Sequence, residues 1–286
     1  MNRTLLPFFS LIRVSGGDAA AFLHGQLSNH IEGLAVGQAC YATYNTPKGR
    51  VSANMIVLRR EADFLLITAA DVAENLIKRL RLFVLRAKAV FEPLPDWGVA
   101  AEWPDGLMPK PAAEPSLNFS AAFSDGLIRI ALPHGGTWLA GPHESLPAYS
   151  ETAEQAWQAH EILSGYPWIA AATANSSVAQ MLNQHTIGGI HFKKGCYPGQ
   201  EIIARAQYRG QVKRGLAVLE SGQPLAAGSP VYAGDEEAGL IINSAPYKER
   251  AVHLAVIKHA AAARPLNAAD CPLAVEHLFF ATAIQE

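Results

Sequence analysis

The residues with the clearest chemical potential lie in residues 190–215, which read IHFKKGCYPGQEIIARAQYRGQVKRG. Six basic residues and one acid, Glu201, fall between Lys193 and Arg214, so this segment carries +5 while the rest of the chain sums to −7. Cys196 follows two lysines and a glycine, and adjacent cations favour a thiolate over a thiol. We therefore expect Cys196 to be the reactive cysteine. The alternative is a glycine-rich structural turn with an inert cysteine and a solvated basic face.

Other catalytic and metal-binding motifs do not complete in this sequence. His160-Glu161 opens like a zinc-protease helix, but Ser164 stands where the second histidine is required. None of the ten histidines pairs with a cysteine at ligand spacing and there is no C-x-x-C, so no metal site is predicted. The sequence has no G-x-G-x-x-G, Walker or G-x-S-x-G motif, which leaves dinucleotide-binding, P-loop and serine-hydrolase functions without support.

The basic segment resembles the signature of a known family, the YgfZ-type folate-binding proteins. The resemblance lies in Lys194-Gly195-Cys196-Tyr197-Pro198-Gly199-Gln200-Glu201, followed by Ala204-Arg205 and Tyr208-Arg209-Gly210. Weaker similarity covers Gly17-Asp18-Ala19, Gln26-Leu27-Ser28-Asn29, Lys48-Gly49-Arg50 and Gly188-Gly189-Ile190. The family comprises accessory proteins of iron–sulfur clusters and tRNA modification, and it is related to the glycine-cleavage T protein, an aminomethyltransferase. The chain departs from the family's pattern at three points: Ala179 replaces a usual proline, Glu161 falls near a position often held by arginine, and His30 replaces a common acid.

The resemblance implies an α+β fold of the T-protein kind, in which a two-part core surrounds a central hole for tetrahydrofolate and a small β-barrel follows. The expected divisions are residues 1–102 for an N-terminal folate-binding part, 117–211 for a second part with the cysteine motif, and 212–286 for the barrel. The implied cofactor is tetrahydrofolate or a derivative that carries a one-carbon unit.

Candidate roles follow for individual residues. Cys196 and Lys194 are the candidate catalytic pair. Folate requires an acceptor for the N–H edge of its pterin ring, an apolar wall for its benzoyl ring and cations for its glutamyl tail. Our candidates are Glu201 for the edge, Tyr197 for the wall and Arg205 or Arg209 for the tail. Gln200 in the same motif and Lys48 and Arg50 in the N-terminal turn complete the folate set. The alternative for the charged members is surface salt-bridging.

Three functions are compatible with these residues. The leading hypothesis is a folate-dependent accessory protein that sustains iron–sulfur assembly or repair in client enzymes, including tRNA-modifying ones. Its expected partners are those clients or other assembly proteins. The second is a folate-dependent one-carbon transferase, which needs an acid placed near the folate nitrogens. The third is a tRNA-binding module built on the +5 segment.

The elements that position these residues are partly visible in the sequence. Residues 40–46 and 51–58 read as strands joined by a turn at Pro47-Lys48-Gly49, and 64–68 as a further strand. Asp18 is placed to cap one helix, and Asp71 starts another whose apolar stripe runs from Leu76 to Val84. Four prolines make 103–116 a linker. Strands at 127–132 and 137–140 and a helix at 151–163 follow, and short strands after residue 212 predict a small barrel or sandwich.

Composition supports a folded protein in a reducing compartment. Half of the 286 residues are apolar and the net charge is −2, which argues against a disordered chain or a globally basic nucleic-acid coat. No apolar run reaches the length of a membrane helix, and the N-terminus is expected to be mature protein. Three scattered cysteines disfavour a disulfide framework and favour the cytoplasm. Cys40 and Cys271, in apolar strand-like runs, are expected to be inert core residues.

Overall fold

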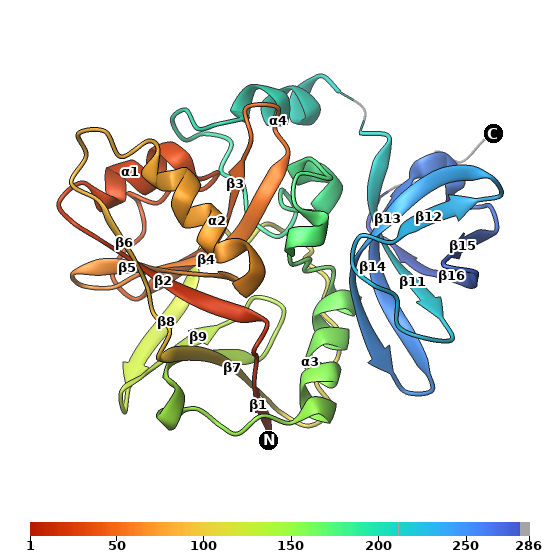
Figure 1. Cartoon of the computed structure of the whole chain (residues 1–286), viewed down its shortest axis with the longest axis horizontal. Helices are drawn as coiled ribbons and strands as arrows, with labels where there is room; N and C mark the ends of the chain where they lie inside the picture. The colour runs from red at the N-terminus through yellow and green to blue at the C-terminus, as the bar shows by residue number, and fades with distance from the viewer. Residues whose placement is uncertain (211, 281–286) are drawn as a thin grey trace.

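A ten-stranded sheet forms the larger part of the molecule in the computed structural model, which describes residues 1–210 and 212–280 (Figure 1). Its strand order is β1-β7-β10-β9-β8-β3-β4-β5-β2-β6. In chain order the strands are β1 (Asn2–Leu5), β2 (Phe9–Ser15), β3 (Gln38–Asn45), β4 (Val51–Arg59), β5 (Asp63–Ala69), β6 (Val90–Pro93), β7 (Trp97–Trp103), β8 (Phe119–Ser124), β9 (Leu127–Ala131) and β10 (Thr137–Pro142). All neighbouring strands are antiparallel, from β1 pairing with β7 to β2 pairing with β6.

The sheet is continuous across the predicted boundary between the two core parts. Strand β7, which contains residue 102, pairs with β1 from the first part and with β10 from the second, and β3 pairs with β8. The two parts of the core are therefore joined by backbone hydrogen bonds, although the predicted divisions remain an interpretation of the sequence. No helix or strand is assigned between β7 and β8 in the described chain, as the prolines predicted for the linker.

Two helices cover the N-terminal strands. Helix α1 (Ala19–Gln26) follows Asp18, whose side chain does not cap the helix as predicted but accepts a hydrogen bond from the Lys88 backbone N–H at 2.7 Å. Helix α2 (Ala70–Arg81) is amphipathic and buries Leu76, Ile77 and Leu80. It ends before Val84, which is only partly buried, so the predicted stripe extended one turn too far.

Helix α3 (Glu151–Ser164) lies between the sheet and the barrel and contacts β1, β13 and β14 (Figure 1). The Ser150 hydroxyl accepts a hydrogen bond from the Ala153 N–H at the start of α3, and Gly165, at φ +78°, ends it. Short 3₁₀ turns follow, and helix α4 (Gln200–Tyr208) occupies part of the basic segment.

The C-terminal strands close into a six-stranded barrel in the order β11-β14-β13-β12-β15-β16. They are β11 (Arg214–Ser221), β12 (Pro230–Ala233), β13 (Glu236–Tyr247), β14 (Arg250–Lys258), β15 (Leu266–Ala268) and β16 (Cys271–Leu278). The short apolar runs predicted a barrel or a sandwich, and the barrel, which the resemblance also implied, is the one that forms. No helix of the described residues is long and apolar enough to cross a membrane.

Candidate functional site

The segment that carries Cys196 is anchored to the end of α1. We call residues 188–201 the Cys196 loop. The Ser28 hydroxyl donates to the Gly189 carbonyl at 2.6 Å, and the Asn29 amide donates to the Gly188 carbonyl at 2.8 Å. The backbone N–H of His191 donates back to the Ser28 carbonyl at 3.0 Å. Two stretches that each resemble the family, 26–29 and 188–190, therefore meet in the fold.

Lys194, within this loop, is buried. The residue is 7% exposed, and its ammonium donates to the carbonyl oxygens of His24 and of Leu27, the latter at 2.6 Å. It also lies 4.8 Å from the centre of the Tyr197 ring. Burial lowers the pKa of Lys194 to about 8, with Glu32 and the cysteine thiols opposing. These contacts give Lys194 a positioning role between α1 and the Cys196 loop.

The turn between β3 and β4 packs against the start of α4. Gly49, in the predicted turn, has a φ of +70°, and Gly199, directly before α4, has a φ of +79°. A Cβ atom on Gly199 would lie 2.6 Å from the Thr46 carbonyl oxygen, and one on Gly49 would lie 2.9 Å from the Ile202 Cβ. The Arg50 guanidinium donates to the Ser176 carbonyl. The turn and the cysteine motif are thus in direct contact.

The three cysteines differ in their surroundings. Cys196 is exposed, whereas Cys40 is buried and burial raises the pKa of its thiol far above the ordinary value. Cys271 is partly exposed, and the Gln223 amide lies 3.0 Å from its sulfur. The expectation that Cys271 is a core residue is therefore wrong. It begins β16, where several side chains face away from the barrel interior.

The remaining predicted folate residues lie on or near α4 and the β3–β4 turn. Lys48, Arg50, Glu201, Arg205 and Arg209 are exposed. The Gln200 amide donates to the Lys194 carbonyl at 3.5 Å, and Tyr197 is buried against Lys194. The fold brings these residues to one region around the Cys196 loop.

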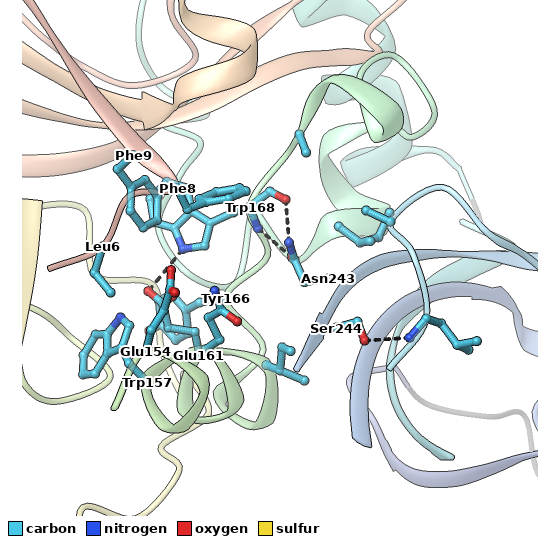
Figure 2. Close-up of a pocket in the computed structure, with 16 residues that line it drawn as sticks. Leu6, Phe8, Phe9, Glu154, Trp157, Glu161, Tyr166, Trp168, Asn243 and Ser244 are labelled. Atoms are coloured by element: carbon cyan, nitrogen blue, oxygen red, sulfur yellow. Dashed lines mark hydrogen bonds between the residues drawn. The ribbon is translucent and has the colours of Figure 1, made fainter. Parts of the chain in front are cut away.

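A separate cavity of about 180 Å³ opens between the sheet, α3 and the barrel (Figure 2). We call it the central cavity. None of the predicted folate residues is among the described residues that line it. Its described lining consists of five aromatic residues, six aliphatic residues and five polar ones: Leu6, Phe8, Phe9, Glu154, Trp157, Gln158, Glu161, Ile162, Tyr166, Trp168, Ala170, Leu225, Ala227, Ile242, Asn243 and Ser244.

Glu161 is the most deeply buried acid of this cavity. Its side chain is 5% exposed, and a carboxyl oxygen accepts a hydrogen bond from the Trp168 indole N–H at 3.2 Å (Figure 2). Burial raises the pKa of Glu161 to about 8, which the indole N–H partly offsets. The two hydrogen bonds between the Asn243 side chain and the Trp168 backbone, both 2.9 Å, tie this wall to the barrel.

The resemblance implied a central hole for folate, but the sequence did not indicate the residues that line this cavity. Phe9, Trp157 and Trp168 come from three distant segments, so no local spacing reveals that they face one another. The available signal was the unusual acid at Glu161. Across the described residues, no group of three or more histidines, cysteines or acids is arranged to hold a metal ion.

Comparison with known proteins connects this fold to a family. No family model matches the chain. Proteins named tRNA-modifying protein YgfZ from Yersinia pestis and Yersinia pseudotuberculosis are 28% identical over 227 residues, which cover 74% of this chain and 68% of each relative. The chain is a relative of the YgfZ proteins. An uncharacterized protein of Haemophilus influenzae is 29% identical over 217 residues, covering 75% of this chain and 72% of that protein.

The fold of this YgfZ relative is that of the glycine-cleavage T protein. The crystal structure of aminomethyltransferase T from Bartonella henselae matches with a TM-score of 0.68, covering 96% of this chain and 84% of that chain at 13% identity. The expected T-protein-like architecture, with its terminal barrel, is confirmed. At this identity the likeness concerns the fold alone.

Proposed function

We propose that this YgfZ relative binds a reduced folate in the central cavity and supports iron–sulfur cluster assembly or repair in client enzymes, including tRNA-modifying ones. The observation that carries the folate assignment is an aromatic-walled cavity with a buried acid, in a fold shared with an aminomethyltransferase. The exposed Cys196 and the free state of all three cysteines support action in the reducing cytoplasm.

The lining residues fit the ring system of a folate. Phe8, which is partly exposed, and the largely buried Phe9 and Trp168 supply apolar ring surface for a pterin and a benzoyl ring. Glu161 supplies the acceptor that an N–H edge needs. We assign ring binding to these groups in place of Tyr197 and Glu201, because Lys194 packs against Tyr197 and Glu201 is exposed. A bound reduced folate would supply nitrogens that carry one-carbon units.

The anionic tail of a folate would lie outside these walls. The described lining of the central cavity contains two acids, Glu154 and Glu161, and no lysine or arginine. A glutamyl tail is not stabilised in such surroundings, so it would extend toward solvent. The predicted partners Arg205 and Arg209 lie exposed on α4, and their role toward the tail remains a hypothesis.

A second candidate is a one-carbon transferase, and Glu161 is the observation that favours it. A transferase needs an acid beside the folate nitrogens, and this cavity holds one. The accessory role ranks first because Cys196, the residue on which the family resemblance centres, does not line the cavity and faces solvent on a loop held by α1.

Titration calorimetry with tetrahydrofolate and 5-formyltetrahydrofolate tests folate binding. We expect saturable binding to the full chain. The absence of both binding heat and a thermal shift would overturn the assignment. Complementation of a strain lacking its own copy, read out by the activity of iron–sulfur enzymes, tests the accessory role. Turnover of an aminomethyl or N-methyl donor with folate would select the transferase instead. Salt-sensitive tRNA binding by the purified protein would favour the RNA-binding alternative.

A further inference from the structure

Glu161 lines the central cavity, and among the described residues no lysine or arginine forms an ion pair with it. One carboxyl oxygen accepts from the Trp168 indole at 3.2 Å and lies 3.8 Å from His134 Nε2. His134, between β9 and β10, is fully buried, and its Nε2 has no hydrogen-bond partner in the described structure. An acid and an unpaired imidazole nitrogen therefore lie side by side behind the cavity wall.

Few of the groups packed around this pair favour charge on either member: the Trp168 indole N–H favours the Glu161 carboxylate, but burial outweighs it. Tyr41 from β3 places its hydroxyl 3.4 Å from His134 Nδ1, and the Tyr166 ring centre lies 4.0 Å from that of His134. His160, on the helix of Glu161, contacts the His134 carbonyl through Nε2 at 3.1 Å. Glu154 lines the same cavity. The positive charge of Lys110 helps to lower the pKa of His134.

Burial consequently dominates the ionisation of both groups. It raises the pKa of Glu161 to about 8 and lowers the pKa of His134 well below the ordinary value. At neutral pH the contact between them joins a carboxylic acid and a neutral imidazole and is not an ion pair. The 3.8 Å between His134 Nε2 and the Glu161 oxygen is longer than a hydrogen bond, so the two groups are neighbours without a hydrogen bond between them.

We infer that Glu161 is the specificity-determining residue of the central cavity: it recognises, as a carboxylate, a ligand edge with two adjacent N–H donors, so that binding releases its proton to solvent. This inference rests on the proposed function and goes further, because it names the ligand edge and makes binding depend on pH. A 2-amino-4-oxo pterin presents such an edge through its ring N–H and its amino group. A carboxylate accepts from both, whereas the neutral acid presents its own O–H to one of them.

The test uses the full chain and 5-formyltetrahydrofolate. Calorimetry at pH 7 in phosphate and in Tris, whose ionisation enthalpies differ, counts the protons released, and we expect about one per folate bound. Affinity should rise about tenfold per pH unit from pH 6 toward pH 8 and level off above it. Glu161→Gln, which keeps the side-chain volume, should abolish both the proton release and the pH dependence and bind at least tenfold more weakly at pH 8.5.

Two controls separate recognition from general effects. Glu154→Gln changes the other acid of the cavity and should retain the pH profile of the wild-type chain. A folate analogue lacking the 2-amino group should lose affinity for the wild-type chain but much less for Glu161→Gln. Folate binding without proton release, at constant affinity from pH 6 to 9, would overturn this inference and leave the proposed function standing. No binding at any of these pH values would remove both.

Discussion

The ammonium nitrogen of Lys194 lies 2.6 Å from the carbonyl oxygen of Leu27, and this hydrogen bond spans 167 residues of sequence. The same ammonium donates to the His24 carbonyl. Carbonyl groups at the end of a helix have no partner within the helix, so Lys194 satisfies the end of α1 while it fixes the loop of Cys196. This buried side chain thus joins two chain segments that Ser28 and Asn29 also connect through hydrogen bonds to Gly189 and Gly188.

Lys194→Met should therefore destabilise the protein by about 1–3 kcal/mol, because it leaves buried carbonyl oxygens without a donor. Urea unfolding gives the free energy, and complementation should fall with it. Lys193→Met is the matched control, since the neighbouring lysine is exposed, and it should alter stability by less than about 0.5 kcal/mol. Equal effects from the two lysines would contradict the positioning role.

Gly199→Ala should separate the β3–β4 turn from α4. At φ +79°, with the Thr46 oxygen 2.6 Å from the new Cβ, the variant meets both backbone strain and a clash. We expect a loss of at least about 1–2 kcal/mol in urea unfolding, with reduced complementation. Gly222→Ala, where a Cβ has open space, is the control. The packing argument fails if the two alanine variants are equally stable.

The sequence predicted the elements whose signal is local. The strands around Pro47-Lys48-Gly49, the stripe of α2 and the barrel strands follow from side-chain periodicity and turn residues. Helix α4 was not predicted, because the flanking glycines Gly195, Gly199 and Gly210 suggested loops. In the structure Gly199 adopts a left-handed conformation immediately before the helix begins.

The candidate site was likewise predicted only where its signal in the sequence is local. The Cys196 loop was found because its motif is contiguous, and family resemblance indicated the segments that meet it. The lining of the central cavity could not be predicted, because Phe9, Trp157 and Trp168 are brought together only by the packing of β2, α3 and the chain after it. The exposure of Cys271 is likewise set by its place at the start of β16 and not by its apolar neighbours.

Phe8→Ala should weaken folate binding about tenfold, because it removes one aromatic wall of the central cavity while Phe8 is itself only partly buried. Calorimetry with 5-formyltetrahydrofolate measures the change. The control is Phe83→Ala, a ring that is 52% exposed and does not line the cavity. If both variants bind folate like the wild-type chain, the ring does not bind against Phe8.

Glu161→Gln should stabilise the folded protein increasingly as the pH rises from 4.5 to 8. The pKa of Glu161 is raised from 4.5 to about 8, so across this interval the folded state holds a proton that the unfolded state has lost. The stability of the wild-type chain therefore falls with pH, and at pH 7.5 the variant should gain about 2–4 kcal/mol over it. Urea unfolding at pH 5 and pH 7.5 checks the difference, which should be under about 1 kcal/mol at pH 5. Glu154→Gln should show no such trend, and a constant offset for Glu161→Gln would contradict the assignment.

Cys196 should be the first thiol alkylated in the native protein and the one whose loss abolishes function. It is exposed on a loop beside Lys194, whereas Cys40 is buried and resists ionisation because burial raises its thiol pKa. Iodoacetamide labelling followed by peptide mass analysis should give the order Cys196, then Cys271, with Cys40 labelled only on unfolding.

Cys196→Ala should keep the fold and bind folate nearly normally, because the residue does not line the central cavity, yet fail to complement. Cys40→Ala and Cys271→Ala should complement, the former with a modest loss of stability from the small void it leaves. Full complementation by Cys196→Ala would make this cysteine structural, and the proposed accessory chemistry would then have to reside elsewhere in the chain.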